Sequence, residues 1–457
     1  TGSGVNYVPG SFAHAYDRTG HTSNASYDNV SASLSFDTGN SHSYSSNNGI
    51  IGIGYLSENK TVQDQIGAYY SGTTGGTVTS GTVRSGEIGI FNAGSGTVYS
   101  TGNISMENGS TTGIKITGSG TVSGGTGGGT VTLSSNSGGV GVDYGNSSGN
   151  LTNMTINVNG TGQSGINATA AISNSKLSNV TINLNNDSST GINSTADVDS
   201  IATISSSNSR SNIIGIKSNG SVTNRGTITL SSRGNVTGID GANATNRGNI
   251  TVSGYGNNNV GIHGTTSATN INGATVNVSG SNYSAGLLSA GTTSNAGTVT
   301  VSGNYSAGLL STAGGTASNS GNVTVTGNYS DGIKSASGSA SSTAWGNITV
   351  NGDQSNGIRG GNGASSANTT VTVNSSGAIY PSRNNGVYAV SGNASASSST
   401  VTMNGGQYNN GVYAAAGNAS VTSSSTISIN GTDHSNGVYA PSGNTTVANS
   451  AINVGIS

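Results

Sequence analysis

The 457-residue sequence has no cysteine, only 3 prolines, and charged residues at just 6%. Without cysteine there are no disulfide bonds and no cysteine-ligated metal sites. A typical soluble domain has about 25% charged residues, so the surface of this protein carries unusually little charge. The 13 basic and 15 acidic residues leave a net charge of −2. No basic patch of the kind that binds nucleic acid is present, so we expect no nucleic-acid partner.

Long apolar runs are missing as well. No stretch approaches the roughly 18 consecutive apolar residues of a transmembrane helix, so we expect no membrane insertion by this segment. The chain starts at Thr1 without a methionine or a signal peptide, and it ends at Ser457 in the middle of a repeat. These two ends lead us to expect a processed or excised piece of a longer protein.

Glycine is abundant instead, with 77 residues, and part of it recurs in phase. The phrase Asn-Gly-Val-Tyr appears at Asn385–Tyr388, Asn410–Tyr413 and Asn436–Tyr439. Earlier copies shorten to Gly followed by Ile, Val or Leu, which makes fifteen copies spaced by 22 to 29 residues. A near-constant period of this length marks a repeat architecture. The repeat glycines are Gly89, Gly113, Gly141, Gly165, Gly191, Gly215, Gly238, Gly261, Gly286, Gly308, Gly332, Gly357, Gly386, Gly411 and Gly437.

A segment of alternating apolar and polar residues precedes the repeat glycine. In one copy Val299 and Val301 alternate with Thr298 and Thr300. A period of two predicts a half-buried strand, here with the valines facing inward and the threonines facing outward. Each repeat therefore has two clear strands, followed by a third segment of small residues such as Ser391–Ser399.

These features predict an all-β fold, a right-handed parallel β-helix with about 24 residues per coil and roughly 15–16 coils. Right-handedness follows from the strong preference for right-handed crossovers between parallel strands. A β-propeller would need a period of about 40 residues, and phased apolar positions argue against a disordered low-complexity chain. The residues predicted to form one inward column are Ile228, Ile250, Val276, Val299, Val323, Ile348, Val371, Val401 and Ile427.

The first 72 residues differ from the remainder. They contain His14, His21 and His42 and seven of the 18 tyrosines, and the coil period is not visible in them. A solenoid needs a terminal cap over its open core and its unpaired strand edge. We therefore expect residues 1–72 to be an irregular N-terminal cap and residues 73–457 to be the β-helix rod. An appended binding domain, or a strand exchanged between subunits, is the alternative for residues 1–72.

Two phrases in the rod carry a resemblance to a known family. The stretches Val222–Ile228 and Gly248–Gly254 resemble those of autotransporter passenger domains, the type V secreted proteins of Gram-negative bacteria. The resemblance covers roughly residues 73–457. It implies a right-handed β-helix that is exported through an outer-membrane barrel and displayed outside the cell. Many members are adhesins, so the resemblance also implies an extracellular, cell-surface location.

Residue patterns for catalysis and for metal binding are weak. Glycoside hydrolysis needs two carboxylates at close range, and Asp197 with Asp199 is the nearest such pair in the rod. The histidines of the rod are His263 and His434, and we expect neither to have a carboxylate in an adjacent column. Asp433 precedes His434, but consecutive strand residues point to opposite faces. No calcium-binding nonapeptide occurs. We expect no enzymatic activity, no metal site and no cofactor.

Two outward columns of the C-terminal half collect tyrosine and cationic side chains. One lies two positions after the repeat glycine, and the other lies three positions before it. Aromatic surface with a few hydrogen-bond donors suits contacts with sugars or proteins. The alternative is a stacking ladder that only stabilises neighbouring coils. The residues predicted to bind a ligand are Tyr388, Tyr413, Tyr439, Tyr408, His434, Arg359 and Lys334.

The sequence thus favours a secreted adhesin that binds a host-cell glycan or protein receptor through the rod surface. The alternative is a structural subunit of an extracellular filament, sheath or matrix, because a weakly charged surface offers little repulsion against self-association. A threonine-rich array on the outward strand faces is of the type that ice-binding solenoids use. Frequent asparagines interrupt it and argue against that function.

Overall fold

The computed structural model describes residues 88–106, 111–207, 212–379, 381–431 and 433–456, and the backbone of nine strands within residues 5–83. The predicted N-terminal cap, residues 1–72, otherwise lies outside the described residues. The nine strands are β1 (Val5–Tyr7), β2 (His14–Tyr16), β3 (Thr22–Ser23), β4 (Val30–Ser35), β5 (Ser41–Ser46), β6 (Gly52–Ile53), β7 (Ile66–Tyr70), β8 (Gly76–Val78) and β9 (Gly81–Val83).

The chain folds as an all-β parallel β-solenoid of about 14 turns with about 25 residues per turn. The predicted fold class is therefore confirmed, with fewer turns than the 15–16 expected. The fifteen repeat glycines lie on fifteen strands, and fifteen strands enclose fourteen repeat intervals. The chain divides into two compact units, Thr1–Gly220 and Ser221–Ser457, which are considered one at a time.

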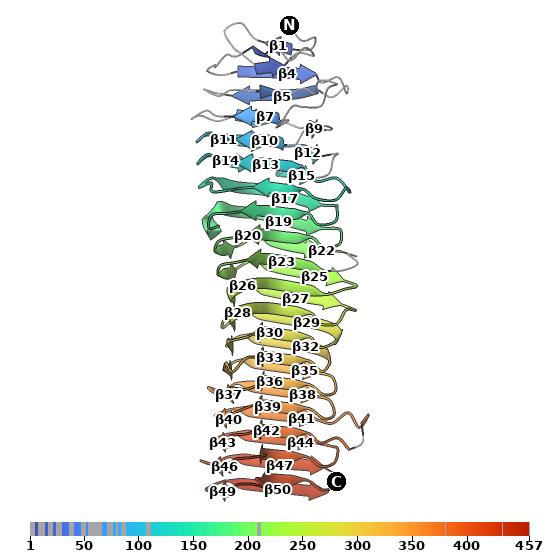
Figure 1. Ribbon diagram of the computed structural model, residues 1–457, viewed down its shortest axis with the longest axis vertical. Helices are drawn as coiled ribbons and strands as arrows, with labels where there is room; N and C mark the ends of the chain where they lie inside the picture. The colour runs from blue at the N-terminus through green and yellow to red at the C-terminus, as the bar shows by residue number, and fades with distance from the viewer. Residues whose placement is uncertain are drawn as a thin grey trace. The chain divides into compact units, whose positions relative to one another are not determined.

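In the first unit, successive coils pair in parallel through two series of strands (Figure 1). The described helical structure of this unit is one 3-10 turn, η1 (Asn174–Lys176). The strands with the repeat glycine are β10 (Ile88–Asn92), β13 (Thr112–Ile116), β16 (Val140–Asp143), β18 (Ser164–Ala168), β20 (Thr190–Ser194) and β23 (Ile213–Ser218). The remaining strands are β11 (Thr97–Ser100), β12 (Asn103–Met106), β14 (Thr121–Ser123), β15 (Gly129–Thr132), β17 (Asn150–Val158), β19 (Leu177–Leu184), β21 (Val198–Ser200) and β22 (Thr203–Ser206).

The second unit repeats three strand segments per coil, two of which are merged into one strand in β26 and in β28. In Figure 1 these strands follow one another in chain order from yellow-green to red. The glycine series is β26 (Val236–Asn246), β28 (Val260–Asn270), β30 (Ala285–Ser289), β33 (Ala307–Ser311), β36 (Asp331–Ser335), β39 (Asn356–Gly360), β42 (Asn385–Ala389), β45 (Asn410–Ala414) and β48 (Asn436–Tyr439). The alternating series is β25 (Thr227–Ser232), β27 (Asn249–Gly254), β29 (Thr275–Asn282), β32 (Thr298–Asn304), β35 (Asn322–Thr326), β38 (Asn347–Asn351), β41 (Thr370–Asn374), β44 (Thr400–Asn404), β47 (Thr426–Gly431) and β50 (Ala451–Ile456).

The small-residue segment of each coil is also a strand in much of the second unit, which the sequence did not reveal. Its alternation is carried by alanine and serine, as in β43, where Ala394 and Ala396 are buried. These short side chains leave a weak apolar signal although the backbone pairs as regularly as elsewhere. The series is β24 (Val222–Asn224), β31 (Thr292–Asn295), β34 (Ala317–Asn319), β37 (Ser339–Ser342), β40 (Gly363–Ala367), β43 (Ala394–Ser397), β46 (Ala419–Thr422) and β49 (Thr445–Val447).

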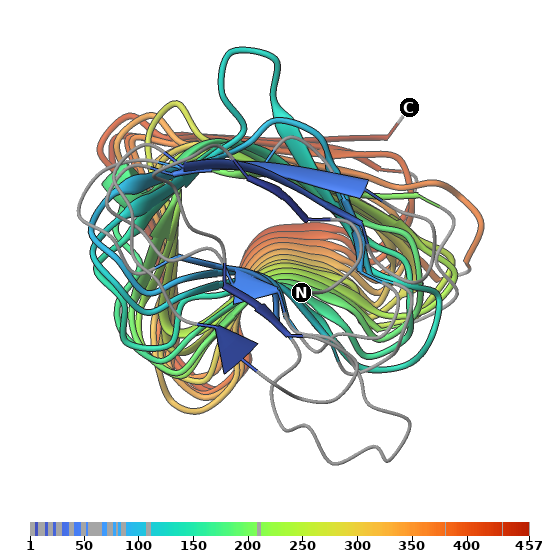
Figure 2. The ribbon, with the colours of Figure 1, turned by 90° about the horizontal axis from the view of Figure 1, so that it is seen from above.

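The interior of the second unit is filled by the predicted inward column. Seen from above, its coils overlie one another around a common interior (Figure 2). Every member of the column is at most 1% exposed, and strand register joins each member to the next, as Val299 joins Val323 and Val323 joins Ile348. Each methylene group buried in this way contributes roughly 0.8 kcal/mol. The column therefore supplies a continuous apolar core that no single coil could form alone.

The repeat glycine has a steric reason. A Cβ atom on Gly386 would lie 2.3 Å from Cγ1 of Val401 and 2.6 Å from the carbonyl oxygen of Gly411. A Cβ atom on Gly308 would likewise lie 2.3 Å from Cγ1 of Val323. The inward valine on the opposite side of the coil fills the space of the missing side chain. The glycine and the inward valine therefore recur together, because their close packing requires both.

A buried amide ladder adds polar stabilisation to the second unit. Each member is at most 2% exposed, and each Nδ2 donates to the Oδ1 of the next coil at 2.8 to 3.0 Å. Every step repeats the same bond, so each amide oxygen from Asn246 onward accepts a hydrogen bond from the preceding coil. Among the described residues, the Oδ1 of Asn224, where the ladder begins, is buried without a hydrogen-bond partner. The members of this ladder are Asn224, Asn246, Asn270, Asn295 and Asn319.

Candidate binding groove

The corner before the repeat glycine has a left-handed backbone in many coils of the second unit. Three positions before the glycine, Tyr305, Tyr329 and Tyr408 have φ values of 54°, 57° and 58°. Such values are uncommon for bulky residues and cost roughly 1–3 kcal/mol each. Strained bulky residues of this kind persist where the surrounding structure, or a function, requires them. The other left-handed residues at this position of the second unit are Asn258, Tyr283, Gln354, Arg383 and His434.

The repeat spacing predicts that these side chains share one column, but it does not indicate their backbone conformation. A signal was present in the first unit, where Gly138, Gly162, Ser188 and Asn212 hold the same position with positive φ. Glycine and asparagine are the residues that adopt this conformation most readily. The glycines and asparagine at this position therefore indicate a left-handed corner, and four coils of the second unit have a tyrosine there.

The corner tyrosines stack on one another. The ring centroids of Tyr283 and Tyr305 lie 5.1 Å apart, and those of Tyr305 and Tyr329 lie 4.7 Å apart. Further along the same column Tyr408 stacks on His434 at 4.8 Å. Offset-stacked rings at such distances contribute about 0.5–1.5 kcal/mol per pair beyond area burial.

The second aromatic row lies two positions after the repeat glycine. Tyr388 and Tyr413 stack at 5.0 Å, and Tyr413 and Tyr439 stack at 5.3 Å. Arg359 precedes them in register, with its Cζ atom 5.7 Å from the centroid of the Tyr388 ring. Lys334 is in turn the register partner of Arg359. The structure therefore places these five predicted residues in one continuous row.

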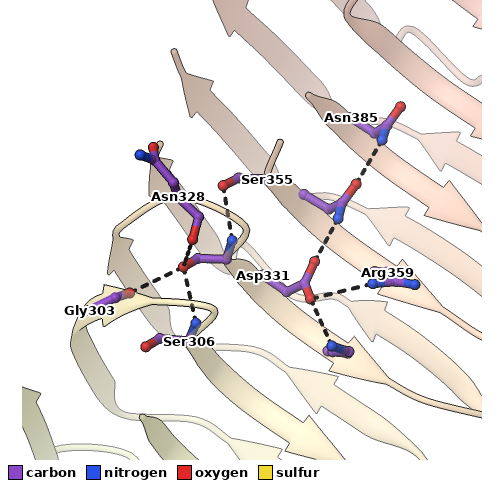
Figure 3. A network of polar contacts seen from close by, with 10 residues as sticks. Gly303, Ser306, Asn328, Asp331, Ser355, Arg359 and Asn385 are labelled. Carbon is purple, nitrogen blue, oxygen red and sulfur yellow. Dashed lines mark hydrogen bonds and ion pairs between the residues drawn. The ribbon is translucent and has the colours of Figure 1, made fainter. Parts of the chain in front are cut away.

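An asparagine ladder runs between the two rows. Nδ2 of Asn436 donates to Asn410 at 3.0 Å, and Nδ2 of Asn410 donates to Asn385 at 2.8 Å. The ladder continues through Asn356 at 2.7 Å and ends at the carboxylate of Asp331 (Figure 3). Every amide in it points the same way, so the carboxylate is the final acceptor. This ladder was not predicted from the sequence, although an asparagine precedes the glycine in each Asn-Gly-Val-Tyr phrase.

These three columns form a groove of about 600 Å³ across three coils. One side combines a cation with an aromatic pair, the other is the tyrosine row, and the asparagines between them form the floor. The groove is lined by Arg383, Tyr408 and His434 on the first side, by Tyr388, Tyr413 and Tyr439 on the second, and by Asn385, Asn410 and Asn436 along the floor. Lys334 and Arg359, predicted as binding residues, are not part of its lining and continue the tyrosine row beyond it.

Stacking decides which part of each tyrosine a ligand can reach. The planes of Tyr388 and Tyr413 are inclined by only 6°, so the two rings cover each other's faces. The groove is therefore bordered by ring edges and hydroxyl groups, whereas the sequence had indicated aromatic faces as the contact surface. Burial, and next the neighbouring phenols of Tyr388 and Tyr439, raise the pKa of the Tyr413 hydroxyl. That hydroxyl thus stays protonated at neutral pH and can donate hydrogen bonds.

A buried carboxylate holds the loop that leads to Arg383. Asp353 is fully buried and accepts hydrogen bonds from the hydroxyl groups of Ser375 and Ser376. The backbone amides of Gly377 and Ile379 donate to it at 3.3 and 2.8 Å. Burial alone would raise the pKa of Asp353, but these donors outweigh it and lower the pKa. The loop that contains Pro381 is thus organised by one buried carboxylate, to which the sequence pattern assigned no role.

Both histidines of the rod do have carboxylate neighbours, which corrects the sequence prediction. Nδ1 of His263 lies 2.7 Å from Oδ1 of Asp240, its register partner in the preceding coil. The hydrogen bond to Asp240 raises the pKa of His263, burial opposes that rise, and the charge of Asp240 adds to it. His434 lies 3.6 Å from Asp433, because the left-handed backbone at His434 breaks the strand alternation.

The other predicted pair, Asp197 and Asp199, flanks Val198 in β21, with Val198 buried. Among the residues that the structure describes, no three His, Cys, Asp or Glu side chains gather in a way that could hold a metal ion. Within the same residues, no helix is long and apolar enough to cross a bilayer.

Fold and groove together define the class of this protein, a parallel β-solenoid with a tyrosine-lined surface groove. No family model matches the chain, and no curated protein or solved structure matches it.

Proposed function

We propose that this protein is a non-enzymatic, secreted cell-surface adhesin of the autotransporter-passenger type. It binds a glycan or a protein of a host cell through the groove between the two aromatic columns. The observation that carries this proposal is the composition of the groove. Much of the remaining outward surface consists of short Ser, Thr, Gly and Asn side chains, which water solvates well and which offer little area for a partner.

The groove combines three features that a binding surface needs. Tyr439 and Tyr408 remain 41% and 38% exposed, so apolar area is available for burial. The phenol edges and the asparagine floor provide hydrogen-bond donors and acceptors. The stacked rows are held before any ligand arrives, which lowers the entropic cost of binding.

Replacing the tyrosine row with serine tests the proposal. Tyr388→Ser, Tyr413→Ser and Tyr439→Ser together should weaken adhesion to host cells, or binding to an isolated receptor, at least about tenfold, because one anchor tyrosine is commonly worth about 2 kcal/mol. The matched control changes the other exposed stack, Tyr283, Tyr305 and Tyr329, to serine, which removes the same groups outside the groove. If the groove variant folds and adheres as well as the parent, the tyrosine row only stabilises the coils, and the proposal is contradicted.

A structural subunit of an extracellular filament, sheath or matrix is the second candidate function. It is favoured by the stack of Tyr283, Tyr305 and Tyr329, whose members are 57%, 46% and 38% exposed and lie on a weakly charged protein. Such a patch could pack against a second copy. Negative-stain imaging and size-exclusion chromatography over a concentration series distinguish the two. A subunit should form polymers that the serine variants of this stack dissolve, whereas an adhesin should remain a discrete particle.

A further inference from the structure

We propose that the ligand of the groove is an anionic polysaccharide that lies across the coils, with an acidic group at Arg383. This inference rests on the proposed function and specifies its ligand class. It is carried by the cations at one end of the groove and by the identical polar groups that each coil contributes along it.

The end of the groove at Tyr388 is cationic. Arg383 lines the groove on one side, and its guanidinium has no ion pair within the part of the chain that the structure describes. On the other side Arg359 lies over the Tyr388 ring, and Lys334 precedes Arg359 in the row. A single carboxylate, Asp331, serves both, at 3.4 Å from Lys334 and 4.0 Å from Arg359.

The charged groups near the Arg383 end of the groove have a net positive charge. Asp331 is 3% exposed and also accepts from Asn356. Asp353 is buried beneath the loop, and its carboxylate already accepts hydrogen bonds from that loop, from the hydroxyl of Ser376 and the amide of Ile379. Three cations therefore face two carboxylates that are both turned away from solvent. At the far end of the groove the exposed carboxylate of Asp433 lies 3.6 Å from His434. An anionic ligand is favoured at the Arg383 end and has no such partner at the His434 end.

The backbone at Arg383 is held in place before a ligand binds. It has φ of 47°, and its backbone amide donates to the carbonyl of Gln407 at 3.0 Å. The residue before it, Ser382, accepts from the amide of Gln407 at 3.2 Å. The preceding loop is fastened to Asp353. The guanidinium that this backbone carries can form two parallel hydrogen bonds to an oxyanion such as a carboxylate or a sulfate.

The remainder of the groove repeats with the coils. Each of the three coils contributes one floor asparagine and one tyrosine of the row, and adjacent coils are about 4.8 Å apart. Equivalent groups at equal steps match a polymer that presents the same hydroxyl groups at each step. A compact single molecule would use only one of the three sets. The ligand class is therefore a polysaccharide with acidic groups.

The test compares two forms of one polymer, polygalacturonate and its methyl ester, which share a backbone and differ in charge. Isothermal titration with the full chain should show binding of the acid at least about tenfold tighter than binding of the ester, the effect of one charge-assisted pair. Arg383→Gln should remove most of that difference and leave binding of the ester unchanged. Arg247→Gln, at an exposed arginine outside the groove, is the matched control and should behave as the parent. Dextran sulfate in place of polygalacturonate tells whether sulfate serves as well as carboxylate.

Each of the other possible results contradicts at least one named element of the proposal. Equal binding of acid and ester, lost in the tyrosine-to-serine variant, would leave the adhesin proposal standing and would contradict the anionic ligand. Acid binding that neither Arg383→Gln nor the tyrosine variant changes would place the site elsewhere. Equal affinity for single-stranded oligothymidylate would show a general polyanion surface and contradict a polysaccharide site. No binding of any polymer, together with undiminished cell adhesion by the tyrosine variant, would contradict both proposals.

Discussion

Nδ2 of Asn356 lies 2.6 Å from Oδ1 of Asp331, and this hydrogen bond ends the amide ladder beneath the groove. The same carboxylate faces Lys334 through its other oxygen, at 3.4 Å. A buried carboxylate without partners would be strongly destabilising. Here it is the acceptor for the ladder and the counter-charge of the cationic row, so the groove floor and the groove charge are joined at one residue (Figure 3).

Removing the carboxylate of Asp331 should destabilise the second unit. Asp331→Ala leaves the buried Nδ2 of Asn356 without its acceptor, which typically costs about 1–3 kcal/mol. Asp331→Asn keeps an acceptor oxygen and loses only the charge, so its cost should be smaller. The midpoint of urea unfolding measures both variants. An Ala variant as stable as the parent would show that the end of the ladder is satisfied by water.

Placing a charge in the inward column should disrupt the solenoid. Val323 is 1% exposed and lies between Val299 and Ile348. Val323→Asp buries an unpaired carboxylate and should cost several kcal/mol. Thr326→Asp, at an exposed position of the same strand, should shift stability by no more than about 0.5 kcal/mol. Thermal melts of the two variants that coincide would refute the inward register of β35.

The loop at Asp353 should make stability depend on acid pH. The pKa of Asp353 in the folded protein is lowered below its ordinary value of 3.8. Its contribution to stability is therefore fully present above about pH 4 and is lost as the pH falls through the folded pKa. The melting temperature of the parent should exceed that of Asp353→Asn by a constant amount above about pH 5, and the gap should narrow on acidification. A gap that widens toward low pH would reverse the sign and contradict the account.

The sequence determined what repeats. The position of Val323 is apolar in every coil of the column. A coil cannot bury its apolar side chains without neighbours, so adjacent coils need an apolar residue at the same position. The position of Gly386 is glycine in each repeat because an inward side chain, here that of Val401, fills the space where a side chain would lie. Tyr388, Tyr413 and Tyr439 hold one phase of the repeat, and phase alone puts them in a row. The fold class, the inward column and this row could therefore be read from the spacing of residues.

The conformation of the corners and loops, where the repeat pattern is interrupted, depends on the tertiary structure. The left-handed corner rotates Tyr408 and His434 away from strand alternation, so that they form the wall opposite the tyrosine row. The loop after β41 returns to Asp353 through bonds that span 22 to 26 residues along the chain. Periodicity specifies which face of a strand a side chain occupies, whereas corners and loops depend on backbone angles and long-range hydrogen bonds that no repeat pattern encodes.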